Sequence, residues 1–162
     1  RSVQVVDSLR EITKLNQSFY AFQNLSTASN PTFSPCVQLW NPPASGKRLI
    51  LQKITFVGTA NTAMYFGMSN VSLATNVGGS FSKLSGGPQS SAQLKTEVLA
   101  VPSAVLPSPV AYRNMVINDN QEFSTNCPFV MIPGYGFTCY AASAGALQTI
   151  LVEFDFYEEL IQ

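Results

Sequence analysis

The sequence contains no histidine, so no imidazole is present to act as a general base, a pH switch or a metal ligand. Catalysis by a serine or cysteine nucleophile normally needs such a base. A serine–lysine pair is conceivable with Lys47 or Lys83, but both lie in Gly/Ser-rich stretches where a solvated lysine is the simpler interpretation. We therefore predict no catalytic residue, no cofactor and no metal site, and a protein that is not an enzyme.

Charged residues are scarce as well. Only 11% of the 162 residues are Asp, Glu, Lys or Arg, against roughly 25% in ordinary soluble domains. The 9 basic and 9 acidic residues cancel, and the absence of a basic run argues against nucleic-acid binding. Either Ser, Thr, Asn and Gln keep the surface polar without charge, or much of the surface is covered in an assembly. We favour the second interpretation.

Long hydrophobic runs and paired cysteine motifs are also missing. No run of eighteen apolar residues occurs, so we expect no membrane-spanning helix and no membrane partner. Three cysteines, Cys36, Cys127 and Cys139, lack CxxC spacing. Their apolar, strand-like surroundings favour buried thiols, and the alternative is one disulfide between Cys127 and Cys139.

What is present is a pattern of alternating apolar and polar residues, which predicts β-strands. The clearest strand covers residues 148–158. One of its faces is apolar and the other can meet water: Ile150, Val152, Phe154 and Phe156 against Leu151, Glu153, Asp155 and Tyr157. Another strand, residues 48–58, places Ile50, Ile54 and Phe56 on one face, and we predict that it forms a hairpin with residues 63–68.

Turn residues separate the predicted strands, as at residues 41–47 and 133–136. No strand–helix–strand alternation and no internal repeat is found. We predict an all-β fold, namely a single antiparallel β-sandwich or jelly roll of about eight strands with an N-terminal arm. Residues 1–18 form the arm or a short helix. Residues 19–162 form the sandwich domain, with a long Gly/Ser-rich loop at 69–93 that is either a contact feature or a poorly ordered insertion.

Two segments suit contact with a partner. Near the N-terminus, apolar residues recur at every third position, which is typical of a short amphipathic helix docked on a neighbour or of an ordinary first element. Residues 102–109 contain three prolines, which predicts an extended edge segment. The predicted partner contacts are Val6, Leu9, Ile12, Leu15, Pro107 and Pro109.

Several segments resemble parts of a group of small structural proteins of tailed-bacteriophage virions. Residues 40–51 are similar to their N-P-A-x-S-G-K turn and the strand after it, although Pro43 stands where a small residue is usual. Residues 132–136 and the ending 152–156 resemble their closing part, and residues 5–11 resemble their opening stretch. The order of these segments along the chain also matches.

The resemblance implies a virion structural protein that is assembled in the cytoplasm of a bacterial host. Its partners would be other virion proteins, either the major capsid protein or tail proteins, and it would form a homo-oligomer, with a trimer favoured. The first expectation is a capsid decoration (cement) protein that stabilises contacts between coat subunits. The alternatives are a tail-fibre or baseplate module that binds a host receptor through residues 69–93, and a carbohydrate-binding, lectin-like domain.

Overall fold

The computed structural model describes residues 17–26, 34–58, 62–99, 113–117, 122–142 and 149–161. These residues form eleven β-strands and no helix. The strands are β1 (Ser18–Ser26), β2 (Ser34–Asn41), β3 (Lys47–Gly58), β4 (Thr62–Ser69), β5 (Thr75–Gly78), β6 (Phe81–Ser82), β7 (Gln93–Leu99), β8 (Arg113–Ile117), β9 (Glu122–Met131), β10 (Tyr135–Ala142) and β11 (Thr149–Leu160). The predicted all-β fold is confirmed, and the short β5 and β6 account for most of the strands beyond the predicted eight.

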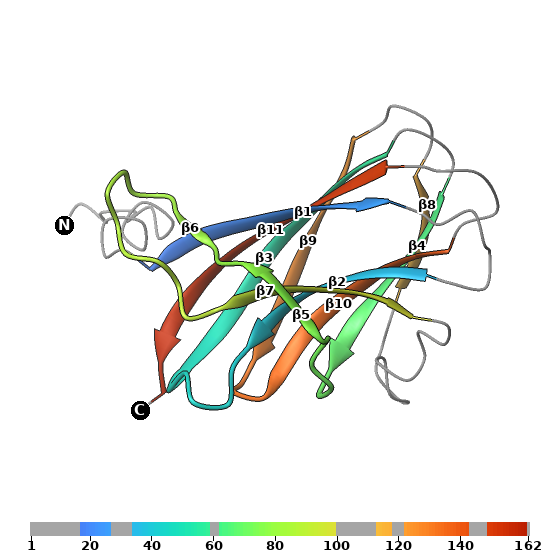
Figure 1. Ribbon diagram of the computed structural model, residues 1–162. Coiled ribbons are helices and arrows are strands. Elements are labelled where there is room, and N and C mark those ends of the chain that lie inside the picture. The colour runs from blue at the N-terminus through green and yellow to red at the C-terminus, as the bar shows by residue number, and fades with distance from the viewer. Residues whose placement is uncertain are drawn as a thin grey trace.

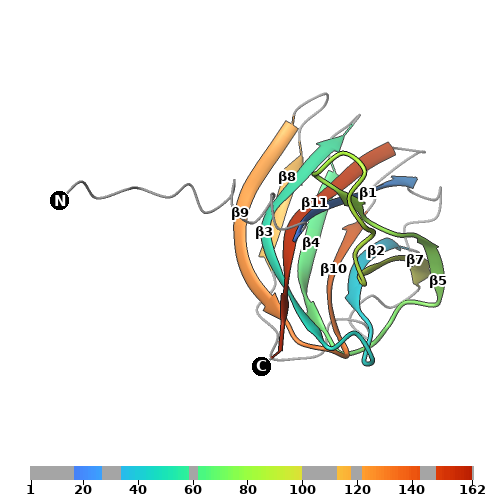
Figure 2. The same ribbon diagram turned by 90° about the vertical axis from the view of Figure 1, so that its left-hand side faces the viewer.

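Two antiparallel sheets pack face to face (Figures 1 and 2). The first sheet has the strand order β6-β1-β11-β3-β9, and the second sheet has the order β5-β7-β2-β10-β4-β8. Hydrogen bonds pair β1 with β11, β2 with β10, β3 with β9 and β4 with β8. Four nested pairs that are divided between two sheets make a jelly roll, and β5, β6 and β7 are an insertion between β4 and β8.

The core lies between the sheets, and β11 shows why it forms. As predicted, Ile150, Val152, Phe154 and Phe156 are fully buried, whereas the residues between them are partly exposed. Phe19 of β1 stacks on Phe156 with ring centroids 5.8 Å apart. Burying one such side chain contributes about 1.5–3 kcal/mol, so this strand alone supplies a large part of the driving force for closing the sandwich.

The alternation in β3 is interrupted at Gln52. Leu51 faces the core before this point and Ile54 faces it afterwards. The register with β11 skips Gln52, which is therefore the extra residue of a β-bulge. The prediction that Ile50 shares a face with Ile54 is wrong, because the bulge shifts the side-chain alternation by one residue and leaves Ile50 on the outer face.

The predicted hairpin of β3 with β4 is also wrong. β3 pairs with β11 and β9 in the first sheet, whereas β4 pairs with β10 and β8 in the second sheet. Because the two strands lie in opposite sheets, their apolar faces pack on each other through the core. Phe56 of β3 stacks on Phe66 of β4 with ring centroids 5.8 Å apart. Two apolar strands that are adjacent in the sequence can thus pack on each other from opposite sheets instead of pairing as a hairpin.

Residues 69–93 include β5 and β6 and are held against the outer face of the second sheet at one place. The buried Gln38 donates from Nε2 to the Val71 carbonyl at 2.9 Å and accepts from the Leu73 amide at 3.0 Å. Leu73 is itself buried and packs on Cys36. This part of the segment is therefore anchored to β2 by both hydrogen bonds and apolar contact.

Candidate functional site

The β2–β3 connection, within residues 40–51, and the β9–β10 connection, within residues 132–136, meet at one end of the sandwich, at the lower edge of Figure 1. The chain crosses between the sheets twice here, from β2 to β3 and from β9 to β10. Asn41 is buried between the two connections and donates from Nδ2 to the Lys47 carbonyl at 2.8 Å and to the Met131 carbonyl at 2.9 Å. The backbone carbonyl of Asn41 accepts a hydrogen bond from the Gly134 amide at 2.9 Å. One residue thereby ties both connections together.

Glycines at this end are required by the backbone and by packing. Gly46 and Gly134 have φ angles of +64° and +84°, in the left-handed region that favours glycine. Gly136 lies against two side chains of β2, because a Cβ atom there would be 2.8 Å from Trp40 Cε3 and 2.9 Å from Gln38 Cγ. The G-K and P-G-Y-G stretches of the sequence therefore build the corner of the fold.

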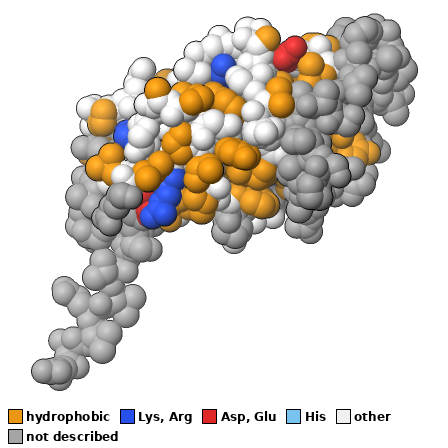
Figure 3. All heavy atoms as spheres, turned by 90° about the horizontal axis from the view of Figure 1, so that it is seen from below, with side chains coloured by type: hydrophobic (Ala, Val, Ile, Leu, Met, Phe, Trp, Pro, Cys, Tyr) orange, Lys and Arg blue, Asp and Glu red, His pale blue; other side chains and the backbone are white. Residues whose placement is uncertain are grey.

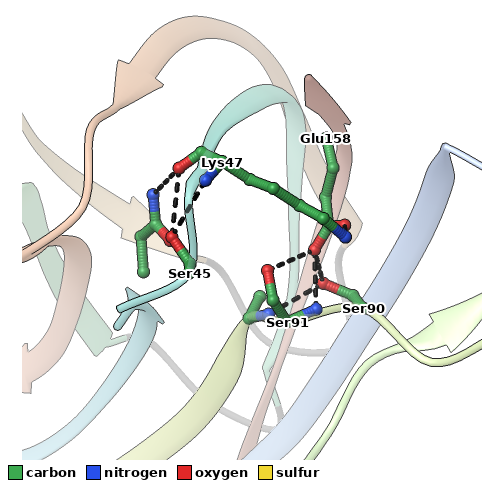
Figure 4. A network of polar contacts seen from close by, with 7 residues as sticks. Ser45, Lys47, Ser90, Ser91 and Glu158 are labelled. Carbon is green, nitrogen blue, oxygen red and sulfur yellow. Dashed lines mark hydrogen bonds and ion pairs between the residues drawn. The ribbon is translucent and has the colours of Figure 1, made fainter. Parts of the chain in front are cut away.

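A buried carboxylate lies near this corner. Glu158 is on the core-facing side of β11, and its side chain is only 4% exposed. The carboxylate accepts from Ser90 Oγ, from the Ser91 amide at 2.7 Å and from Ser91 Oγ at 2.9 Å, and it pairs with Lys47 Nζ at 2.5 Å (Figure 4). Lys47, Ser90 and Ser91 all point at the carboxylate, so this buried charge has a cation and three hydrogen-bond donors around it.

Burial acts to raise the pKa of Glu158, but the hydrogen bonds from Lys47, Ser90 and Ser91 outweigh burial and hold that pKa below its usual value. A carboxylate of low pKa is a weak general base near neutral pH. Both serine hydroxyls donate to Glu158, and a carboxylate of lowered pKa is too weak a base to activate them near neutral pH. The arrangement suits a tether that joins the segment before β7 to β3 and β11.

The other carboxylates of β11 lie on its outer face, where two of them form ion pairs. Asp155 pairs with Lys83, and Glu159 pairs with Arg48 at 2.7 Å. Among the described residues, no three His, Cys, Asp or Glu side chains are grouped closely enough to hold a metal ion. The described carboxylates therefore do not form a metal site.

Two of the cysteines are buried on neighbouring strands, as the sequence predicts. Burial, and secondarily the charge of Glu97, raises the pKa of the Cys36 thiol to about 12. Cys139 of β10 is buried in the core between the sheets. A buried thiol with a raised pKa, such as that of Cys36, is unreactive. The side chain of Cys127 lies outside the described part of the chain.

Several large hydrophobic side chains are exposed on the described surface. Those that are exposed are Phe22, Val71, Val77, Phe81, Leu84, Val98, Val130, Ile132, Tyr135, Leu160 and Ile161. Figure 3 views the end of the sandwich where the β2–β3 and β9–β10 connections lie, and it shows clusters of hydrophobic side chains with few charges among them. We call this surface the corner surface and define it by Pro43, Ile132 and Tyr135, which lie on or beside the two connections.

The predicted partner contacts Val6, Leu9, Ile12, Leu15, Pro107 and Pro109 lie outside the described residues, so their role stays a prediction. Sequence reasoning missed the burial of Glu158 and the exposure of Phe22. A signal existed for both. Glu158 continues the alternate positions that end in Phe154 and Phe156, and Phe22 alternates with the buried Ala21.

The described residues include no helix that is long and apolar enough to cross a membrane. No protein-family model matches this chain, and a comparison of its sequence with curated proteins finds no significant match. The site must therefore be interpreted from its own geometry.

Proposed function

We propose that the chain is a non-enzymatic structural protein of a bacteriophage virion, and that it acts as a capsid decoration (cement) protein between coat subunits. The observation that carries the proposal is a surface with eleven exposed large hydrophobic side chains in its described part, on a chain with only 11% charged residues. A protein that works alone in solution keeps its surface charged and free of apolar patches. A subunit that neighbours cover in a particle has no such need.

The corner surface is the face that we assign to the coat. Two of the segments with the expected resemblance, residues 40–51 and 132–136, reach this surface, and Asn41 fixes their two connections to one another. Ile132 is 53% exposed on this rigid base. A preorganised apolar contact loses little conformational entropy on binding, which favours tight attachment. The jelly roll adds only an analogy, since this fold occurs in virus capsid domains and in lectins alike.

A tail-fibre or baseplate module that binds a host receptor is the second candidate, and one observation favours it. Four of the exposed hydrophobic side chains lie between residues 69 and 93: Val71, Val77, Phe81 and Leu84. Gln38 and Glu158 anchor this segment at its two ends. Binding sites are often carried on segments that a rigid scaffold holds in this way.

Antibody labelling of purified virions, viewed by electron microscopy, tests the choice of location. Label over the capsid supports decoration, label confined to the tail supports the second candidate, and absence of the protein from virions contradicts both. Light scattering of the isolated chain measures its oligomeric state, for which we predict a trimer.

Variants of the corner surface test the assigned face. We expect Ile132→Ser to weaken binding to capsids that lack the protein by about tenfold, because it removes the apolar anchor. The matched control is Val98→Ser, since Val98 is 56% exposed on β7, away from the corner. Equal binding by both variants would show that the corner surface does not face the coat.

A further inference from the structure

Three aromatic rings gather on the outer face of the first sheet, at the strand pair β1–β6. Tyr20 and Phe22 are two residues apart on β1, with ring centroids 6.4 Å apart and ring planes inclined by 9°. Phe81 of β6 lies 5.4 Å from Tyr20 and 6.1 Å from Phe22, within 30° of parallel to each. We call these three side chains the aromatic platform. Phe22 is 46% exposed and Phe81 is 50% exposed.

The fold determines why the platform faces outward. On β1 the alternate residues Phe19 and Ala21 are buried in the core, so Tyr20 and Phe22 must point away from it. The register of β6 on β1 pairs Tyr20 with Phe81, which brings the third ring beside the other two. Rings in this arrangement pack on one another over part of their surface, and the rest of that surface is open to a ligand.

Polar groups of both signs surround the platform. The register places Glu153 beside Phe22 and Asp155 beside Tyr20. Lys83 pairs with Asp155, and Lys53 lies opposite Asp155 on β3. Two carboxylates and two ammonium groups give this patch no net charge, so it offers hydrogen-bond acceptors and donors without selecting for a charged ligand.

We propose that the aromatic platform is a binding site for a neutral sugar ring of a glycan chain. The face of a pyranose ring carries C–H groups, which pack on the negative face of an aromatic ring. Its hydroxyl groups match the acceptors Glu153 and Asp155 and the donor Lys83 at the rim. A cation is disfavoured because the lysines already balance the carboxylates. A protein partner, which would need about 800 Å² from each side, is the competing occupant, and capsid binding tests it separately.

Calorimetric titration of the purified full chain with cellohexaose, maltohexaose and chitohexaose tests the site. We expect at least one of these neutral hexasaccharides to bind. Phe22→Ala and Phe81→Ala should each weaken that binding by about tenfold, which is the scale of losing one stacked ring. Tyr135→Ala is the matched control, since Tyr135 is an exposed aromatic residue on the corner surface. This variant should bind the oligosaccharide as the wild type does.

The inference is overturned if none of the three oligosaccharides binds, or if Tyr135→Ala weakens binding as much as the platform variants do. Circular dichroism on each variant confirms that the fold is intact. Capsid binding separates this inference from the proposed function, because Phe81→Ala should leave capsid binding unchanged. A Phe81→Ala variant that loses capsid binding while no sugar binds the wild type would make the platform a protein contact and overturn the inference.

Discussion

At the scale of the residue, Glu158 occupies a position where the alternation of β11 predicts an apolar side chain. A buried carboxylate without partners would cost several kcal/mol, and here Lys47, Ser90 and Ser91 supply the partners. These partners come from parts of the chain that are remote from β11 in sequence. Because the buried carboxylate needs these partners, Glu158 links β3, β11 and the segment before β7.

We expect Glu158→Gln to lower the free energy of unfolding at pH 7 by about 1–3 kcal/mol, because the charge-assisted hydrogen bonds are lost while the side chain stays buried. Urea denaturation measures this change. The matched control is Glu159→Gln, because Glu159 forms an exposed ion pair with Arg48, and an exposed pair contributes only about 0–1 kcal/mol. Similar losses in the two variants would contradict the role of burial.

The stability that Glu158 contributes should depend on pH. The pKa of Glu158 is lowered in the folded state from its ordinary value of 4.5, so its contribution to stability is fully present above pH 4.5. The contribution is lost as the pH falls through the lowered folded pKa. Urea titrations at a series of pH values should show the stabilities of wild type and Glu158→Gln converging in acid. A constant difference between them down to pH 2 would be inconsistent with an ionised Glu158.

Gly136 is the second residue whose role is sharply defined. A methyl group at this position collides with Trp40 and Gln38, so we expect Gly136→Ala to destabilise the fold by about 1–3 kcal/mol through overpacking. Thermal unfolding measures the loss. Gly79→Ala is the control, because the nearest atom to a Cβ there is 3.9 Å away, and it should leave the melting temperature almost unchanged.

At the scale of the element, Asn41 joins the two connections at the corner. Asn41 supplies the donors for the Lys47 and Met131 carbonyls, so Asn41→Ala leaves two carbonyl groups without these partners. We expect a loss of about 2–3 kcal/mol in the free energy of unfolding, measured in urea.

Hydrogen exchange shows which part of the fold Asn41→Ala destabilises. The amide of Gly134, which donates to the Asn41 carbonyl, should exchange faster in Asn41→Ala because the β9–β10 connection loosens. Asn24→Ala on the exposed part of β1 is the control. Unchanged protection at Gly134 would show that each connection is stable without the other.

At the scale of the whole molecule, the jelly roll pairs its first strand with its last. β1 and β11 are joined along nine residue pairs although they lie at opposite ends of the described chain. Contacts between distant segments slow folding, because the entropy of closing the chain is lost before the contacts form. We expect refolding on a time scale of milliseconds to seconds or longer. Stopped-flow fluorescence of Trp40, the single tryptophan, measures the rate, and refolding within microseconds would contradict this topology.

Sequence alone determined the class of the fold and most of its strands, because alternation is a local property of a chain in which one strand face is buried. The absence of histidine and the shortage of charge likewise limit the chemistry, because both are properties of composition and do not depend on how the chain folds. Of the site, the sequence indicated the turn residues at the corner and the acidic end of β11. It did not indicate that Asn41 and Gly134 would bond to each other, since they are distant in the chain.

Tertiary structure alone decided which strands pair, where alternation breaks, and what each polar side chain does. The bulge at Gln52 and the separation of β3 from β4 follow from packing across the core, which local pattern does not record. The aromatic platform required the register of β6 on β1, and the low pKa of Glu158 required partners from distant parts of the chain. These features depend on contacts between distant residues, and only the closed sandwich brings those residues together.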